Sequence, residues 1–298
     1  MKSNTATDKS EAWTRYWSAA PKVFSGCLPE APAAVTDLIE GIWTEFFDGI
    51  PQKAKVLDLG TGGGAVLMLA HANRPDLKLT GVDYANSLPD LDKDISLFPQ
   101  INLEELPFED KTFEAVTSQF AIEYASEAEA VSELKRVLTQ GGVYLLLCHN
   151  ADSIIVKHNV TRLETIKDLL SRDGLIKSAI KIIKQKKMHA PKSRKHLSRL
   201  LQAVQIKHPD EPIINEVAGN IASITTEMGS LKKIMSLCQN IKMEGQRISA
   251  LKKSALTQSH AEDLGHQLRL LGRPAQLHEV YLPETRTPLA WKITNMSI

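Results

Sequence analysis

The chain has 298 residues, of which 43% are hydrophobic, so it can bury a sizeable core in one large domain or in a domain with a substantial insertion. The first residues are polar and no apolar run is long enough to span a membrane, which argues against secretion and membrane insertion and favours a cytoplasmic protein. The net charge of +1 excludes a chain that is basic or acidic throughout, and three widely spaced cysteines fit neither a zinc site nor a disulfide framework.

The first half of the chain alternates between amphipathic segments and short apolar runs. Apolar residues at three- and four-residue spacing predict a helix over 33–50. Strands are predicted over 54–60, 77–83, 95–102, 113–119 and 143–149, with helices over 65–74 and 126–138. Buried strands that alternate with helices are typical of a parallel sheet with helices on both faces.

The pattern changes after Asn150. From about 153 to 258 the apolar residues recur at helical spacing, which predicts an all-helical insertion. A helix over 261–272 follows, and then two extended runs, 275–283 and 287–294, which lie too close together for a parallel crossover and therefore form an antiparallel hairpin. We expect N-terminal helices over 1–50, one core built from 51–152 and 259–298, and a helical cap over 153–258.

Charge is distributed unevenly along the chain. Ten of the 36 lysines and arginines lie between Asp173 and Asp210, where there is no acidic residue. This segment would attract anions, although a solvated amphipathic helix would look the same in sequence. The sequence thus joins a basic helical segment to a net acidic remainder.

A glycine-rich turn follows the first predicted strand, in the stretch VLDLGTGGGAV at 56–66. A strand, a glycine turn and a helix N-terminus present backbone N–H groups to a ligand. GTGGGA also fits a relaxed dinucleotide-binding pattern, and Asp83 has the spacing of a ribose ligand in either case. Two features disfavour a pyrophosphate. Asp58 lies two residues before Gly60, where a carboxylate suits a cation, and a dinucleotide domain does not require the closing hairpin.

Four ordered motifs resemble those of the class I S-adenosylmethionine-dependent methyltransferases, in their small-molecule type 11 branch. VLDLGTGGG resembles the first motif and GVDYA, at 81–85, the second. Residues 102–124 resemble the family's stretch around strand 4, and 134–147 the helix and fifth strand that follow. The resemblance implies an α/β, Rossmann-like fold: a seven-stranded, mostly parallel sheet with an antiparallel last strand, helices on both faces and, here, a helical insertion after strand 5.

The same resemblance implies that S-adenosyl-L-methionine is the cofactor and that no metal is needed. The implied cofactor-binding residues are Asp58, Gly60, Gly62, Gly64, Asp83, Tyr84, Asn102, Leu103 and Gln119. Asp83 would hold the ribose hydroxyls, while Asn102 and Leu103 would line the adenine. Many family members carry an acidic residue where this chain has Asn102. The amide oxygen of Asn102 can accept the same hydrogen bond, without charge assistance.

Residues just after strands 4 and 5 should face the substrate, because ligands of open α/β sheets lie beyond the carboxyl ends of the strands. They are Gln119, Phe120, Glu123, Tyr124, His149 and Asn150. We expect Glu123 and His149 to be the catalytic residues, with His149 able to take a proton near neutral pH. The alternatives are a hydrogen-bonded structural histidine and a solvated glutamate.

The substrate is less clearly marked than the cofactor. We expect a small or medium-sized acceptor, anionic or carrier-bound, with an anionic partner at the basic segment: a carrier protein, RNA or a membrane surface. An RNA methyltransferase and a non-catalytic binding module are the alternatives. Residues 174–209 contain no Phe, Trp or Tyr, which argues against recognition of RNA by stacking. Trp13, Tyr16 and Trp17 share one helix face and would form either a lid or a staple.

Overall fold

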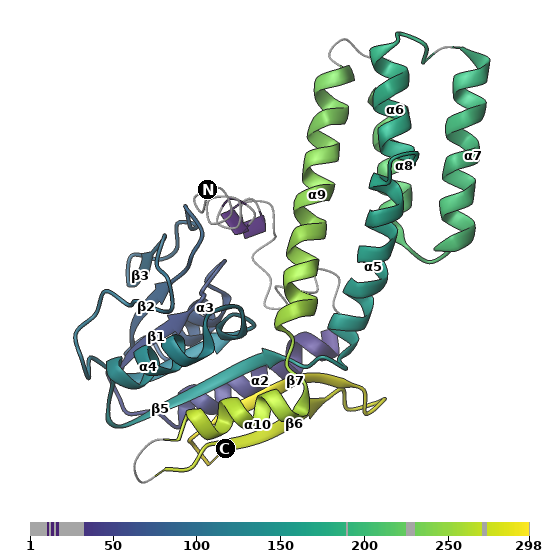
Figure 1. Ribbon diagram of the computed structural model, residues 1–298. Helices are drawn as coiled ribbons and strands as arrows, with labels where there is room; N and C mark the ends of the chain where they lie inside the picture. Colours follow the sequence, from purple (N-terminus) through teal and green to yellow (C-terminus); the bar gives the residue numbers. More distant parts are fainter. Residues whose placement is uncertain are drawn as a thin grey trace. The chain divides into compact units, whose positions relative to one another are not determined.

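The computed structural model describes residues 11, 13–14, 16–17, 33–188, 190–224, 230–269 and 273–297 (Figure 1). It divides the chain into two compact units, one of residues 1–156 and 253–298 and the other of residues 157–252. No helix among the described residues is both long and apolar enough to cross a membrane.

The first unit is built on one seven-stranded sheet. Its strands are β1 (Lys55–Leu59), β2 (Lys78–Val82), β3 (Ile95–Phe98), β4 (Phe113–Gln119), β5 (Leu138–His149), β6 (Gln276–Tyr281) and β7 (Pro288–Thr294). They lie in the order β3-β2-β1-β4-β5-β7-β6, and β7 is antiparallel to both of its neighbours. The predicted fold class, a mostly parallel sheet with an antiparallel last strand, is therefore confirmed.

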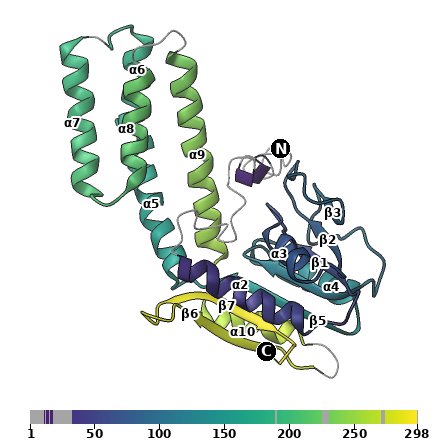
Figure 2. The same ribbon diagram turned by 180° about the vertical axis from the view of Figure 1, so that it is seen from behind.

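Helices cover both faces of this sheet. They are α2 (Ala33–Asp48), α3 (Ala65–Asn73), α4 (Glu127–Val137) and α10 (Gln258–Gln267), with a short 3₁₀ helix, η1, at Ile122–Tyr124. Figures 1 and 2 show α2 and α10 on opposite sides of the sheet. Successive residues of β5 alternate between the two cores, since Leu145 and Leu147 pack with α2 and α3 whereas Leu146 and Cys148 pack with α4 and α10. This alternation explains why β5 reads as one continuous apolar run.

β3 and α10 end earlier than the sequence predicted, and two elements begin earlier than predicted by three residues or more. β5 begins at Leu138, five residues early, because Leu138 pairs with Phe113 ahead of an irregularity in the ladder. The last helix begins at Gln258 instead of 261, because the Thr257 side chain caps it by accepting from the backbone N–H of His260. Neither of these earlier starts moves the carboxyl ends of the parallel strands, where the site was expected.

The second unit is helical. It contains most of α5 (Ile154–Leu170) and α9 (Ser230–Ser254), together with α6 (Leu175–Lys184), α7 (Pro191–Lys207) and α8 (Pro212–Ile224). These five helices enclose a separate apolar core that includes Leu169, Ile176, Val217 and Ile234. Leu231 and Met235, near the start of α9, lie outside this core and are 36% and 52% exposed.

Candidate functional site

The site begins at the glycine turn between β1 and α3. Gly60, Gly62 and Gly64 have φ angles of 69°, 51° and 78°, a left-handed conformation that strains other residues. The turn is tied to the neighbouring strand, because the backbone N–H of Thr61 donates to Val82 at 2.9 Å. It therefore holds its backbone close to the carboxyl ends of β1 and β2.

Side chains of the protein itself lie against these glycines. A Cβ added to Gly60 would overlap Ala121, one added to Gly62 would overlap the indole of Trp17, and one added to Gly64 would overlap Leu91. Part of the requirement for glycine is thus internal packing. Ala121 and Leu91 were missed by sequence reasoning, because each contact joins the turn to a segment distant in the sequence.

Asp83, at the end of β2, is joined directly to the glycine turn. One of its carboxylate oxygens accepts from the backbone N–H of Gly62 and the other from that of Ala85, each at 2.8 Å. Its side chain is buried, and burial raises its pKa, against the lowering effect of these bonds. Each oxygen retains a further lone pair, so the carboxylate can still accept from a ligand hydroxyl.

Asp58, at the end of β1, is a second buried carboxylate of the site. Its Oδ1 accepts from the hydroxyl of Thr117 on β4 at 2.8 Å. Burial raises the pKa of Asp58 to about 7; the bond from Thr117 lowers it, and the nearby Asp83 raises it further. Sequence reasoning missed Thr117, although its place on β4 opposite Asp58 follows from the strand register.

The remaining cofactor candidates lie around these carboxylates. The backbone N–H of Ile101 donates to the Asp83 carbonyl at 3.0 Å. The exposed Asn102 directly follows Ile101 and therefore lies near Asp83. Leu103 packs partly against the core between the sheet and α4, and Tyr84 is half-buried. Gln119 lies at the end of β4, where its Oε1 accepts from the Trp43 indole at 2.6 Å. Their contacts with a cofactor stay predictions.

Glu123, in η1, and His149, at the end of β5, are brought together. Glu123 Oε1 lies 2.7 Å from His149 Nδ1 and also accepts from the His149 backbone N–H at 2.9 Å. Both side chains are completely buried. The other carboxylate oxygen of Glu123, Oε2, is buried with no hydrogen-bond partner among the described residues, a cost that a donating ligand would remove.

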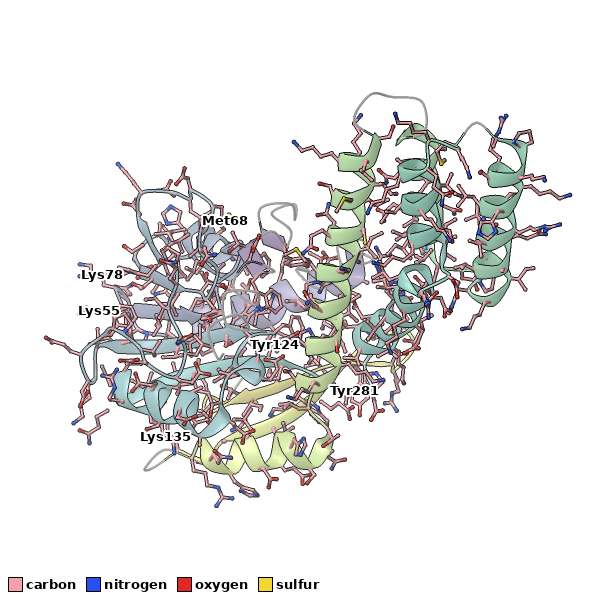
Figure 3. The ribbon with its side chains drawn as sticks, turned by 45° about the horizontal axis from the view of Figure 1, so that its top comes forward. Lys55, Met68, Lys78, Tyr124, Lys135 and Tyr281 are labelled. Carbon is pink, nitrogen blue, oxygen red and sulfur yellow. The ribbon has the colours of Figure 1, made fainter. Side chains whose placement is uncertain are left out.

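Aromatic rings enclose this pair. Phe120 stacks on His149 at 4.4 Å between ring centroids, and Tyr124, labelled in Figure 3, meets His149 edge-on at 6.0 Å. Phe120 has a φ of 55°, which is uncommon for a residue with a side chain and a feature that clusters at functional sites. Asn150, also predicted to face the substrate, instead donates to Glu279 at 2.7 Å.

The described N-terminal aromatics lie over the same region. Trp17 packs on Gly62, Tyr16 meets Trp17 at 4.9 Å, and Trp13 meets Tyr124 edge-on at 5.4 Å. The backbone N–H of Asn86 also donates to the Thr14 hydroxyl at 2.7 Å. These contacts join the N-terminal segment to the glycine turn and to the neighbours of His149, as a lid or a staple requires.

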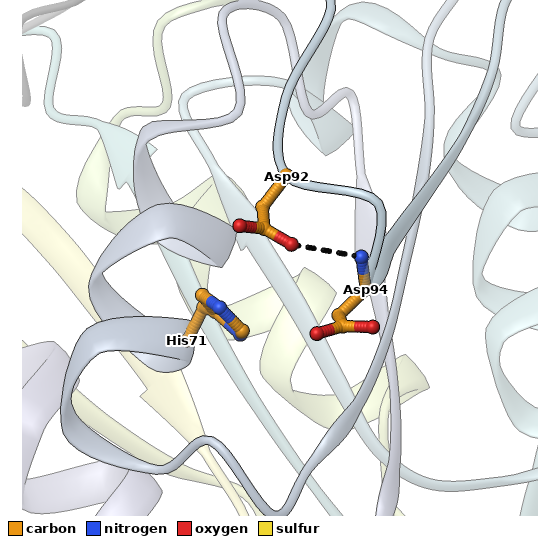
Figure 4. A group of neighbouring side chains, drawn as sticks. All are labelled: His71, Asp92 and Asp94. Carbon is orange, nitrogen blue, oxygen red and sulfur yellow. Dashed lines mark hydrogen bonds between the residues drawn. The ribbon is translucent and has the colours of Figure 1, made fainter.

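One group of metal-binding side chain types gathers elsewhere in the described part of the chain. His71 of α3 and the exposed Asp92 and Asp94, which precede β3, place their ligand atoms within 4.8 Å of one another (Figure 4). The backbone N–H of Asp94 donates to Asp92 at 3.1 Å. Exposed acidic groups commonly gather without an ion, and we assign no metal chemistry to these residues.

Comparison with known proteins identifies the segment that carries this site. Residues 57–146 match the family model described as a methyltransferase domain. This segment is a class I S-adenosylmethionine-dependent methyltransferase domain. It holds Asp58, the glycine turn, Asp83, Asn102 and Glu123, whereas His149 lies three residues beyond its end.

Relatives of the methyltransferase domain act on different molecules. A ubiquinone/menaquinone biosynthesis C-methyltransferase of Desulfotalea psychrophila is 35% identical over 100 residues, which cover 32% of this chain and 41% of the relative. A carboxy-S-adenosyl-L-methionine synthase of Campylobacter lari is 28% identical over 104 residues, which cover 32% and 44%. The chain thus spans about four-tenths of the length of these relatives. A solved geranyl diphosphate C-methyltransferase of Streptomyces coelicolor is 20% identical, with a TM-score of 0.37, over 47% of this chain and 64% of that chain.

Proposed function

We propose that the whole chain transfers the methyl group of S-adenosylmethionine to a small-molecule acceptor. The observation that carries this proposal is the bond from the Gly62 N–H to the buried carboxylate of Asp83, which lies inside the matched domain.

The unpaired cysteines Cys148 and Cys238 suit a reducing compartment, and we place the enzyme in the cytoplasm.

The residues of the site fit this cofactor. Asp58 and Asp83 are buried carboxylates next to a left-handed backbone that favours glycine, which suits a cationic ligand that carries ribose hydroxyls. When bound, the cofactor supplies a methyl group already activated by the adjacent sulfonium. The protein then has to hold both reactants in line and keep water away. Asp83 would orient the ribose, Asp58 would offset the positive charge, and the N-terminal aromatics would exclude water.

Glu123 and His149 would prepare the acceptor. Glu123 Oε1 holds His149 Nδ1 at 2.7 Å, which fixes the orientation of the imidazole ring. The pair can take an acidic proton from the acceptor as the acceptor attacks the methyl group, and can later release it to solvent. An acceptor of this kind is anionic in its reacting form, as a hydroxylated aromatic compound is after losing a proton.

The surroundings of the pair favour a planar apolar acceptor. Phe120, Tyr124 and Trp13 supply aromatic surface at or near His149, and aromatic rings prefer to pack on one another. The Desulfotalea relative is a C-methyltransferase of quinone biosynthesis, which agrees with such an acceptor. A carrier-bound acceptor would need the same chemistry, with its carrier held elsewhere on the protein.

Substitution of the pair tests this role, with transfer from S-adenosylmethionine to a panel of hydroxylated aromatic compounds measured by mass spectrometry. Glu123→Gln and His149→Asn are each expected to lower kcat by roughly 10²- to 10⁴-fold, the usual contribution of a positioned base. Cofactor affinity should change little. His278→Asn, which alters an exposed histidine of β6, is the matched control and should behave as wild type.

A purely structural pair gives a different result. If Glu123→Gln and His149→Asn lower the melting temperature but leave kcat unchanged in the protein that stays folded, the base is elsewhere. If neither reaction product nor cofactor binding is detected in the wild type, the chain is a binding module on the methyltransferase fold.

A further inference from the structure

The helical unit has one strongly basic end. Figures 1 and 2 both show that α6 ends and α7 and α9 begin at the same end of this bundle. Exposed lysines lie on these helix ends and on the turn after α6, and we call six of them the basic tip: Lys181, Lys184, Lys187, Lys192, Lys195 and Lys232. Lys186, Arg194 and Lys233 are also exposed and lie among them in the sequence. The helix ends thus bring to one end of the bundle charges that are more than fifty positions apart in the sequence.

Among the described residues of the helical unit, the acidic side chains lie away from the basic tip, and Glu227, between α8 and α9, lies outside the described residues. Lys207, at the far end of α7, pairs with Asp168 at 2.7 Å, and Arg162 pairs with Glu244 at 2.6 Å. The salt bridges found among the described residues of this unit include none of the six tip lysines. Asp173 precedes α6 and Asp210 follows α7, so both acids belong to the other end of these helices.

Apolar side chains accompany these charges. Leu231 and Met235 are 36% and 52% exposed on the first two turns of α9, and their i, i+4 spacing places them on one helix face beside Lys232. Neither reaches the core of the bundle, although their spacing is that of core residues. Lysines around protruding apolar side chains are typical of surfaces that rest on a bilayer, where the ammonium groups meet headgroups and the apolar groups enter between them.

The composition of the tip distinguishes among anionic partners. Lysines, which are compact ammonium groups without the planar fork with which arginine holds individual phosphates bidentately, outnumber arginine at this end, where Arg194 lies in the first turn of α7. The adjoining segment 174–209 has no aromatic residue on which bases could stack. Diffuse attraction to many headgroups requires neither feature, and it contributes about 1 kcal/mol for each lysine near an anionic surface.

We propose that the basic tip docks the protein reversibly on an anionic phospholipid surface. Docking is peripheral, since no described helix can span a membrane. The lysines supply long-range attraction, and Leu231 and Met235 supply a shallow apolar contact. The proposal goes beyond methyl transfer, because it concerns where the protein works and not what its site does.

Flotation with vesicles tests the docking, using the full chain. The protein should bind vesicles of phosphatidylserine and phosphatidylcholine but not of phosphatidylcholine alone, and high salt should release it because it shortens the Debye length below about 10 Å. Lys184→Glu/Lys187→Glu should weaken binding by more than about tenfold, given about 1 kcal/mol lost per lysine. Leu231→Ser/Met235→Ser should remove whatever binding survives high salt.

The matched control carries the same change of charge at another place. Lys55→Glu/Lys78→Glu alters two exposed lysines that are register partners at the starts of β1 and β2, both labelled in Figure 3, and should bind vesicles as wild type does. Circular dichroism checks that each variant is folded. The proposal would be overturned if the protein bound neutral vesicles as tightly as anionic ones, or if both lysine double variants lost the same amount of vesicle binding. A single-stranded poly(U) that binds more tightly than the vesicles and is released by the tip substitutions would also overturn it. Cofactor binding is measured separately, so a failure of docking leaves the methyl-transfer proposal unaffected.

Discussion

Asp83→Ala is expected to weaken binding of S-adenosylmethionine by roughly 10- to 150-fold, or about 1.5 to 3 kcal/mol, the value of hydrogen bonds to a charged group. Two losses contribute. The ribose hydroxyls lose their acceptor, and the glycine turn loses the bond from the Gly62 N–H that holds its shape. Isothermal titration calorimetry of both proteins measures the change directly.

Asp83→Asn is the variant that separates these two losses. Its amide oxygen can still accept from one of the two backbone N–H groups, so the turn should stay closer to its native conformation than in Asp83→Ala. We expect an intermediate affinity and a smaller loss of thermal stability. If Asp83→Ala is folded and binds the cofactor as wild type does, Asp83 does not belong to the site.

Asp58→Asn is expected to stabilise the unliganded protein above neutral pH and to weaken its binding of the cofactor. Burial raises the pKa of Asp58 from 3.8 to about 7. At a pH between these two values, the folded state therefore keeps a proton that the unfolded state has released. The free energy of unfolding therefore falls as pH rises from about 4 to 7, by at most about 4 kcal/mol, and the full penalty persists at higher pH. Asparagine mimics the neutral acid and removes this penalty.

The same substitution predicts a pH dependence of binding. A cationic cofactor favours ionised Asp58, so wild-type affinity should rise with pH toward about 7 and then level off, with release of a proton below that pH. In Asp58→Asn this dependence should vanish, and affinity at pH 8 should be about tenfold lower, which corresponds to about 1.4 kcal/mol.

Asp76→Asn supplies a control of opposite sign for the stability measurement. The Arg74 guanidinium holds the pKa of Asp76 below its usual range, so this carboxylate stabilises the fold above its unfolded pKa and loses that effect as pH falls. Thermal unfolding at pH 5 and pH 8 should therefore show Asp58→Asn gaining stability relative to wild type at the higher pH, where Asp76→Asn is destabilised. Equal melting temperatures for wild type and Asp58→Asn at pH 8 would contradict a buried, ionised Asp58.

Most of the sheet could be predicted because its signals are local. Each of the five parallel strands ahead of the insertion is a short apolar run, and the final pair lies too close together for a crossover. The place of β7 between β5 and β6 has no local signal. It depends on pairing between Leu145 and Thr294, which are about 150 residues apart. Exposure of Leu231 and Met235 likewise has no local signal, because periodicity cannot show that a helix extends past the core of its bundle.

The candidate site divides in the same way. The glycine turn and Asp83 could be placed from motif order, and Glu123 and His149 from their positions at neighbouring strand ends. The hydrogen bonds from Thr117 to Asp58 and from Trp43 to Gln119 could not be predicted, because each joins segments more than fifty residues apart. The elevated pKa of Asp58 likewise arises from burial, which the sequence does not encode locally.

The central claim is that this chain binds S-adenosylmethionine at the glycine turn, and calorimetric titration with that cofactor and, separately, with NAD tests it most directly. We expect micromolar binding of S-adenosylmethionine alone, weakened in Asp83→Ala, and mass spectrometry of the purified protein shows whether the same cofactor co-purified. Binding of NAD, or of neither compound, would contradict this claim.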